Sequence, residues 1–332
     1  MRHRALFTAF ILILTACSSP AAETTLPEPT STTSSTSSST TSTSTTTTST
    51  TSTTTTTTTV PTTTTSAAPA TTAAPPPTTT TPPATQPTMP AHCRPQMFTD
   101  EVVAQIAADY PGKLITAWVH DLRTGCDYSL NPQNRQRTAS VFKVMVMAGT
   151  LLEAQNEGRP VSDWEMSQLT PMITRSTNDE VRALWNHFGG SPWFKTQRDI
   201  FGLGQTRVTA DDGSSWGLTT TSARDQVNLL RQVLLGQWGP LQAEYRAVAL
   251  DLMTSVVSSQ TWGVTAGVPS GWRVALKNGF AGPTINSVGW VDGPGSDPGY
   301  VVAILSQGWP DHPAGIAAVE RVSRIVADAM TR

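Results

Sequence analysis

The chain has 332 residues, a formal net charge of −2 and a very uneven composition. The near-neutral charge and the lack of a basic run argue against nucleic acid as a partner. No apolar stretch after Leu14 is long enough to cross a bilayer, so small molecules, peptides and cell-wall material remain as partner classes. The histidines are scattered and no His/Cys cluster has the spacing of metal ligands, so we expect neither a metal nor another cofactor.

The N-terminus has the pattern of an export signal. A basic start precedes a short apolar run over residues 5–14, which is typical of the hydrophobic region of a signal peptide. The next residues, Leu-Thr-Ala-Cys over 14–17, resemble the lipobox of bacterial lipoproteins, in which the cysteine becomes the lipidated first residue. We therefore expect residues 1–17 to be a lipoprotein signal peptide and Cys17 to anchor the chain, by lipid alone, outside the bacterial cell membrane. The alternative is an ordinary secretory signal in which Cys17 is incidental.

Residues 18–91 consist almost entirely of Thr, Ser, Pro and Ala. Such a segment cannot bury enough apolar surface to offset its conformational entropy, so we predict a disordered linker that precedes a folded domain, residues 92–332. If Cys17 carries lipid, Cys93 and Cys126 remain as a pair in an oxidising compartment, which favours a disulfide between them.

Hydrophobic periodicity in the folded part predicts an α+β domain. The predicted elements, in chain order, are a helix over 99–110, strands over 113–119 and 126–130 that form a hairpin, helices over 141–153, 178–188, 223–235 and 243–257, strands over 272–276, 287–291 and 300–305, and a helix over 316–330. Strands at both ends with helices between them imply one antiparallel sheet built from both chain ends, flanked by the terminal helices, with an inserted helical lobe. We expect a functional site in a cleft between sheet and lobe.

Ser140 and Lys143 form a Ser-x-x-Lys motif at the start of a predicted helix. Residues three apart share a helix face, so the amine can lie beside the hydroxyl. An amine acts as a base only if burial or a neighbouring cation lowers its pKa, and a helix N-terminus stabilises a developing oxyanion. Taken alone, the motif also fits a surface lysine on an ordinary helix.

Two further segments make the pattern more specific. Ser-Thr-Asn stands at 176–178 before a predicted helix, and Lys-Asn-Gly stands at 277–279 after a predicted strand. With the motif at 140–143, they resemble the Ser-x-x-Lys, Ser-Asp-Asn and Lys-Thr-Gly motifs of the class A β-lactamases and related penicillin-binding serine hydrolases, in the same order. The chain has only four lysines, and two of them fall at motif positions. The resemblance covers residues 95–332.

This resemblance implies a β-lactamase-like fold and a role for each matched residue. Ser140 would attack a carbonyl while Lys143 accepts its proton, and Ser176 would pass a proton to the leaving nitrogen. The backbone N–H groups of Ser140 and Phe280 would form an oxyanion hole. The substrate-binding residues that the resemblance implies are Asn178, which would also hold Lys143, and Lys277, Asn278, Gly279 and Phe280.

Departures from the family include a shorter stretch between Lys143 and Ser176 and two positions that bear on the reaction. Asn278 stands where the family has Thr or Ser, which puts hydroxyl recognition of a substrate carboxylate in doubt. The loop over 208–217 lacks the glutamate that activates the deacylating water in the family; Asp212 falls near its position and is the candidate for deacylation. We expect a monomer that forms an acyl-enzyme on Ser140 with a β-lactam or a D-amino-acid peptide amide. The alternative is a non-hydrolysing penicillin- or muropeptide-binding protein of the cell envelope.

A second nucleophile pattern competes with Ser140. Gly-x-Ser-x-Gly occurs at 213–217, and Asp292 and His312 follow it in the order of an α/β-hydrolase triad. That elbow requires an apolar strand before it and an apolar helix after it, whereas the residues on both sides are polar. The sequence therefore favours Ser140.

Overall fold

The computed structural model describes residues 90–208 and 216–332, and in these ranges a five-stranded sheet is the central layer. Its strands, in the order β2-β1-β7-β6-β5, are β2 (Asp127–Leu130), β1 (Leu114–Asp121), β7 (Tyr300–Gln307), β6 (Thr284–Asp292) and β5 (Arg273–Ala281). All neighbouring pairs are antiparallel, and β1 from the start of the domain pairs with β7 from its end. The predicted α+β fold, with a sheet built from both chain ends, is confirmed.

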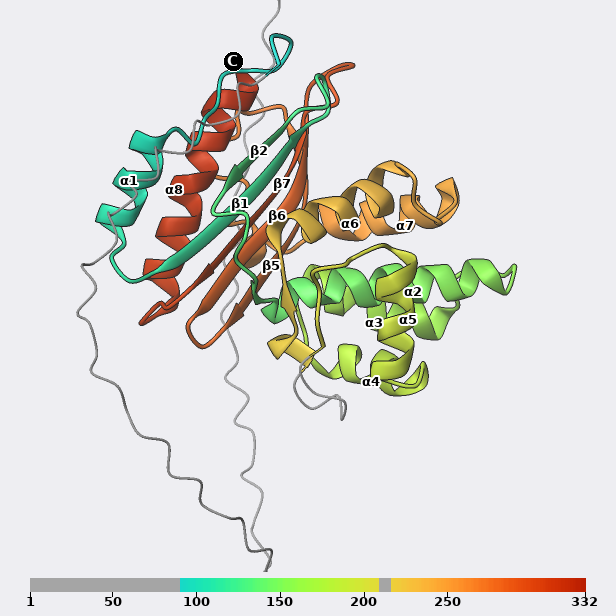
Figure 1. Cartoon of the computed structure of the whole chain (residues 1–332). Helices are drawn as coiled ribbons and strands as arrows, with labels where there is room; N and C mark the ends of the chain where they lie inside the picture. Colours follow the sequence, from blue (N-terminus) through green and yellow to red (C-terminus); the bar gives the residue numbers. More distant parts are fainter. Residues whose placement is uncertain (1–89, 209–215) are drawn as a thin grey trace, which may run out of the picture. The chain divides into compact units, whose positions relative to one another are not determined.

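Helices cover both faces of this sheet (Figure 1). On one face lie α1 (Asp100–Asp109) and α8 (His312–Thr331), and on the other lies α6 (Ala223–Leu235). Side chains of β7 alternate accordingly: Val301 and Ala303 belong to the core on the α6 side, and Val302 belongs to the core on the α8 side. A sheet buried on both faces fixes its register, because a slip by one residue would exchange the two cores.

The helical lobe lies between β2 and β5 in the chain. Its helices are α2 (Phe142–Asn156), α3 (Asp163–Thr174), α4 (Asp179–His187), α5 (Ser191–Ile200) and α7 (Ala243–Thr254). Two short strands, β3 (Gln136–Arg137) and β4 (Thr220–Thr221), pair with each other. In the chain, β3 precedes α2 and β4 follows α5. No helix in the described ranges has both the length and the apolar character that a membrane span requires.

The differences from the predicted elements include those at β5, α8, α3 and α5. Strand β5 continues five residues beyond the predicted end at residue 276, because its polar continuation is buried and hydrogen-bonded. Helix α8 begins at His312, after Asp311 caps it by accepting from the Ala314 N–H. Helices α3 and α5 were not predicted, since α3 contains Pro171 and α5 is rich in polar residues.

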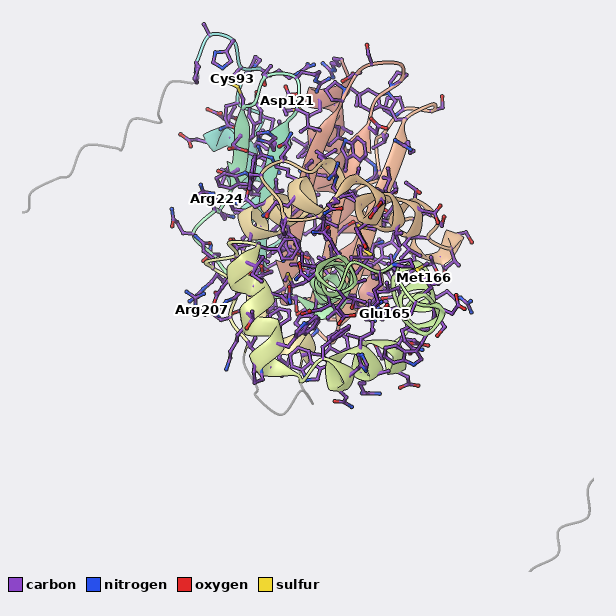
Figure 2. The ribbon with its side chains drawn as sticks, turned by 90° about the vertical axis from the view of Figure 1, so that its right-hand side faces the viewer. Cys93, Asp121, Glu165, Met166, Arg207 and Arg224 are labelled. Carbon is purple, nitrogen blue, oxygen red and sulfur yellow. A yellow bond between two sulfur atoms is a disulfide. The ribbon has the colours of Figure 1, made fainter. Side chains whose placement is uncertain are left out.

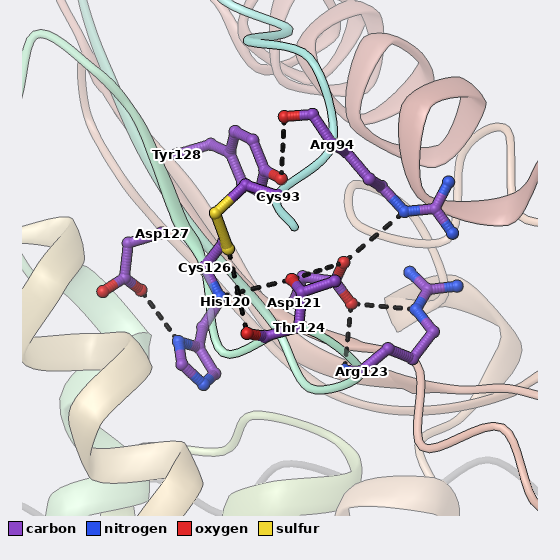
Figure 3. The surroundings of a disulfide bond; sticks show 9 residues. All are labelled: Cys93, Arg94, His120, Asp121, Arg123, Thr124, Cys126, Asp127 and Tyr128. Atoms are coloured by element: carbon purple, nitrogen blue, oxygen red, sulfur yellow. Dashed lines mark hydrogen bonds and ion pairs between the residues drawn. A yellow bond between two sulfur atoms is a disulfide. The ribbon is translucent and has the colours of Figure 1, made fainter. Parts of the chain in front are cut away.

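A disulfide joins Cys93 and Cys126, the pair that the sequence favoured (Figure 3). It ties the segment before α1 to the hairpin formed by β1 and β2. Arg94, next to it, pairs with Asp121 at 3.4 Å and donates to the carbonyl of Arg332 at 3.1 Å, so both ends of the domain meet here. In Figure 2 this corner, marked by Cys93, lies at the opposite end of the domain from the labelled lobe residues.

We predict that the Cys93→Ser/Cys126→Ser variant has a free energy of unfolding lower by about 2–4 kcal/mol, because the bond closes a loop with a sequence separation of 33. Urea denaturation with and without reductant measures the change. Reductant should lower the stability of the wild type and leave that of the variant unchanged. Equal stability of the two proteins without reductant would contradict the prediction.

Candidate active site

Ser140 lies in a 3-10 turn, Ala139–Val141, that joins the small sheet to α2. Asn286 of β6 donates its side-chain amide to the two carbonyls just before the turn, at 2.8 and 2.9 Å. Ala139 has φ of +44°, a left-handed conformation that costs energy for a residue with a side chain. The neighbouring strands thus hold a strained turn, with Ser140 only 8% exposed at its centre.

Strand β5 passes directly behind this turn at Gly279. A Cβ atom at this position would lie 2.8 Å from the backbone N of Val141 and 2.9 Å from that of Ser140. Backbone atoms cannot yield at such distances without moving the turn, so glycine is required. Gly279 therefore sets the spacing between the strand and the candidate nucleophile.

Lys143 is completely buried in the first turn of α2. Its Nζ donates to the carbonyl of Ser176 at 2.5 Å and to Oδ1 of Asn178 at 2.8 Å, and lies 3.5 Å from the Ser176 Oγ. The ring centroid of Trp216 is 5.2 Å from the same nitrogen. The contact between Lys143 and Asn178 that the resemblance implied is present, and Trp216 is an additional neighbour.

Lys277 of β5 reaches the same serine from the sheet. Its Nζ donates to the Ser176 Oγ at 2.7 Å and to the carbonyl of Asn278 at 2.9 Å. Ser176 itself has φ of +65°, and both of its oxygens contact lysine amines. The three motif segments, which are far apart in the sequence, therefore meet at Ser176.

The two amines have strongly perturbed pKa values. Burial lowers the pKa of Lys143 to about 7, and the Glu180 carboxylate acts against this effect. Burial, together with repulsion by Lys143, holds the pKa of Lys277 well below its ordinary range. A lysine that is partly neutral near pH 7 can accept a proton, which is the property a base beside Ser140 requires.

Ser140, Ser176 and Asn178 open into one cleft of about 380 Å³. The other lining residues are Ala139, Arg182, Trp216, Gly217, Leu218, Phe280 and Ala281. Among the residues that the structure describes, Arg182 is the one charged residue in this lining. A larger cavity of about 620 Å³, beside the loop between α2 and α3, is lined by none of these residues and is not part of the site.

Asn278 does not present its side chain to this cleft. Its amide nitrogen donates to the carbonyls of Gln260 and Trp262 at 2.8 and 3.0 Å, and its oxygen accepts from the Ser287 hydroxyl at 2.6 Å. The residue is 1% exposed. The Asn278 side chain therefore fixes the loop at 260–262 to the sheet, and substrate binding by Asn278 stays a prediction.

Phe280 and Trp216 form parts of the cleft wall. The Phe280 ring is 42% exposed and packs edge-on against His312, with centroids 4.4 Å apart. Trp216 packs on Phe142 of α2 at a centroid distance of 5.5 Å while also lining the cleft.

Sequence reasoning did not select Arg182 or Asn286, because neither belongs to one of the three motifs.

Some candidate residues cannot be placed. Cys17, Asp212 and the serines at 214–215 lie outside the described residues. Asp292 ends β6, whereas His312 follows β7 at the end that pairs with the start of β6. A nine-residue strand spans roughly 26 Å between its ends, so Asp292 and His312 cannot form one triad.

Comparisons with known proteins support the family and the fold. The model of the β-lactamase enzyme family matches residues 99–177 and 169–330. A PBP-A variant, solved as an acyl-enzyme complex with penicillin G, is 23% identical over 69% of this chain and 94% of that chain, with a TM-score of 0.61. An ancestral class A β-lactamase is 21% identical over 69% and 99%, and a β-lactamase from Burkholderia vietnamiensis is 18% identical over 68% and 94%, both with a TM-score of 0.61. No curated protein matches the chain.

We predict that Gly279→Ala lowers the free energy of unfolding by about 1–3 kcal/mol, because the added methyl group would clash with the backbone of the Ser140 turn. Urea denaturation measures the loss. Gly204→Ala is the matched control, since a Cβ at Gly204 meets no atom within 4 Å. Equal stability of the two variants would contradict the prediction.

Proposed function

Since the chain belongs to the β-lactamase enzyme family, we propose that it is a serine hydrolase that forms an acyl-enzyme on Ser140 with a β-lactam or a D-amino-acid peptide amide. The observation that carries this proposal is the buried Lys143, whose amine contacts both oxygens of Ser176 beside a cleft that Ser140 lines. The PBP-A variant among the structural neighbours, which carries a penicillin acyl group, supports the choice of a β-lactam as first probe.

In this mechanism the neutral amine of Lys143 removes the proton from the Ser140 hydroxyl as its oxygen bonds to the carbonyl carbon. The backbone N–H groups of Ser140 and Phe280 stabilise the tetrahedral oxyanion. Collapse of the intermediate breaks the carbon–nitrogen bond, and the Ser176 hydroxyl passes a proton from Lys143 to the leaving nitrogen. Lys277 stabilises this arrangement by donating to the Ser176 Oγ. An ester on Ser140 and a protonated leaving amine result.

Release of the acyl group needs a water molecule and a base. The loop over 208–217 has no glutamate, and Asp212 is the candidate for this role. If Asp212 does not serve, the protein remains acylated and acts as a penicillin- or muropeptide-binding protein. These two outcomes differ in the lifetime of the same adduct.

The site of action follows from the N-terminal sequence. We place the domain outside the cytoplasm, attached to the bacterial cell membrane through lipid on Cys17 and separated from it by the linker over 18–91. Metabolic labelling with a fatty acid tests this assignment. Label in the wild type and none in Cys17→Ala supports it, and equal label in both proteins would contradict it.

An intact-mass time course with benzylpenicillin tests the proposed reaction. We predict an increase by the mass of one penicillin in the wild type and no increase in Ser140→Ala. Loss of the adduct over minutes would indicate a turning-over hydrolase, and its persistence would indicate a penicillin-binding protein. A wild-type protein that forms no adduct would refute acylation by penicillins.

Arg182 gives the cleft a preference that can be tested. It lies on the same face of α4 as Asn178, four residues later, and Asp179 accepts from it at 2.8 Å, which occupies one of its five N–H donors. Because it is the one charged residue that the structure describes in the cleft lining, we expect it to favour acyl donors whose side chain carries a carboxylate.

We predict that Arg182→Gln slows acylation by a penicillin with a carboxylated side chain about two- to fivefold more than acylation by benzylpenicillin, the range for an exposed ion pair. Rates of adduct formation measure both effects. Arg175→Gln, an exposed arginine outside the cleft lining, is the control and should change neither rate. Equal slowing of both penicillins would contradict this role for Arg182.

A further inference from the structure

Glu180, in the first turn of α4, has a buried carboxylate oxygen without a partner. Its Oε2 makes no hydrogen bond within the described part of the chain. Burying an ionised oxygen without a hydrogen bond is costly, so such an atom in a native fold needs a reason. The reaction proposed for Ser140 does not use it.

The position of Glu180 relates it to Lys143. Asn178, the N-cap of α4, accepts from the Lys143 Nζ at 2.8 Å, and Glu180 follows two residues later in the same turn. Its carboxylate raises the pKa of Lys143, against the larger lowering by burial. The carboxylate thus acts on this buried amine without forming a direct ion pair with it.

In the ranges 90–208 and 216–332, few other charges compete for this position. From β5, Lys277 adds a second buried amine, whose pKa burial and Lys143 both lower. The remaining ionisable side chains of α2, α3 and α4 are exposed or have other partners. Asp163 and Arg175, which follows α3, are exposed, and His187 packs against Trp164. The acidic groups with partners are Asp179, which pairs with Arg182, Glu165, which pairs with Arg159, and Glu153, which accepts from Trp193 and Gln197. On α5, Arg198 pairs with Asp199, and on α7, Arg246 donates to a carbonyl.

A purely structural role for Glu180 is the alternative. Thr177 and Glu180 have the spacing of a capping box, in which the glutamate would bind the backbone at the helix start. However, the Thr177 hydroxyl has no hydrogen-bond partner among the described residues, and α4 has no side-chain cap hydrogen bond there. The capping box is therefore not formed.

We propose that Glu180 is the counter-ion of Lys143: it stabilises the ammonium that forms when Lys143 takes the proton from Ser140. It is a positioning residue, since it acts through Lys143 and does not contact the reacting atoms. The inference rests on the proposed function for the Ser140 step. The negative charge would come from α4, next to the Ser-Thr-Asn segment.

Glu180→Gln tests this proposal, because glutamine keeps the size and the capping ability of glutamate and removes its charge. With only four lysines in the chain, protein labelled with ¹³C at the lysine ε-carbon gives few signals, and the Lys143 signal is the one lost in Lys143→Met. Removal of a nearby negative charge disfavours the ammonium, so the titration midpoint of Lys143 should move to lower pH by about 0.5–1 unit.

Asp179→Asn is the matched control. It removes an exposed carboxylate one residue away, whose partner is Arg182. The Lys143 midpoint should stay within about 0.2 units of the wild type, because solvent screens an exposed charge. An unchanged midpoint in Glu180→Gln, or an equal shift in both variants, would overturn the proposal.

The pH dependence of acylation gives a second readout. Lys143 must be neutral to accept a proton, so the rate rises with pH through its pKa of about 7. In Glu180→Gln this rise should move to lower pH by the shift seen in the titration, and the plateau should fall about three- to tenfold because the ammonium loses its counter-ion. A plateau and a midpoint equal to those of the wild type would count against the counter-ion role.

The two readouts separate this inference from the proposed function. If penicillin acylates neither protein, the choice of substrate fails, and the lysine titration still decides the role of Glu180. If the wild type is acylated and the midpoint does not move in the variant, Ser140 chemistry stands and Glu180 has no part in it. Circular dichroism of both variants confirms that they are folded.

Discussion

Two lysine amines are buried around one serine, and the architecture of the site depends on this arrangement. Lys143 and Lys277 are at most 1% exposed, and both amines contact Ser176. Removing an amine from water favours its neutral form, so the same burial that lowers stability supplies a base near neutral pH. The arrangement requires the lobe helix, the turn before α4 and strand β5 to meet within hydrogen-bond distance.

Strand β5 meets this requirement because its successive residues point to opposite faces of the sheet. Lys277 and Gly279 point to the lobe face, where one reaches Ser176 and the other allows the Ser140 turn to pass. Asn278, between them, points to the opposite face and binds Ser287 and the loop at 260–262. Asn278 of β5 pairs with Ser287 of β6, which fixes the register of the two strands. A shift of this register by one residue would turn Lys277 away from the site. Three consecutive residues thus have three separate structural tasks.

The same alternation explains which features the sequence could predict. Apolar residues located α6 at 223–235 and the sheet strands, because α6 buries one apolar face and the central strands are buried on both faces. The apolar pattern ended β5 too early, since Lys277 and Asn278 are polar residues buried by partners distant in the sequence. Resemblance placed Asn278 with the substrate-binding residues, but motif position does not determine side-chain direction. Arg182 and Glu180 were missed because helix spacing alone does not distinguish a residue facing the site from a solvated one.

Backbone strain at the site is offset by the rest of the fold. Ala139 and Ser176 are two of the few non-glycine residues with positive φ in the described ranges, and each belongs to a segment that contacts a buried lysine or carries the candidate nucleophile. Such conformations persist only where the surroundings determine them. Here the amide of Asn286 holds the turn, and the lysines hold Ser176. The apolar core on the lobe side includes Val141 and Phe142, next to Ser140, so it supports this geometry directly. The disulfide lies away from the site and adds stability without touching it.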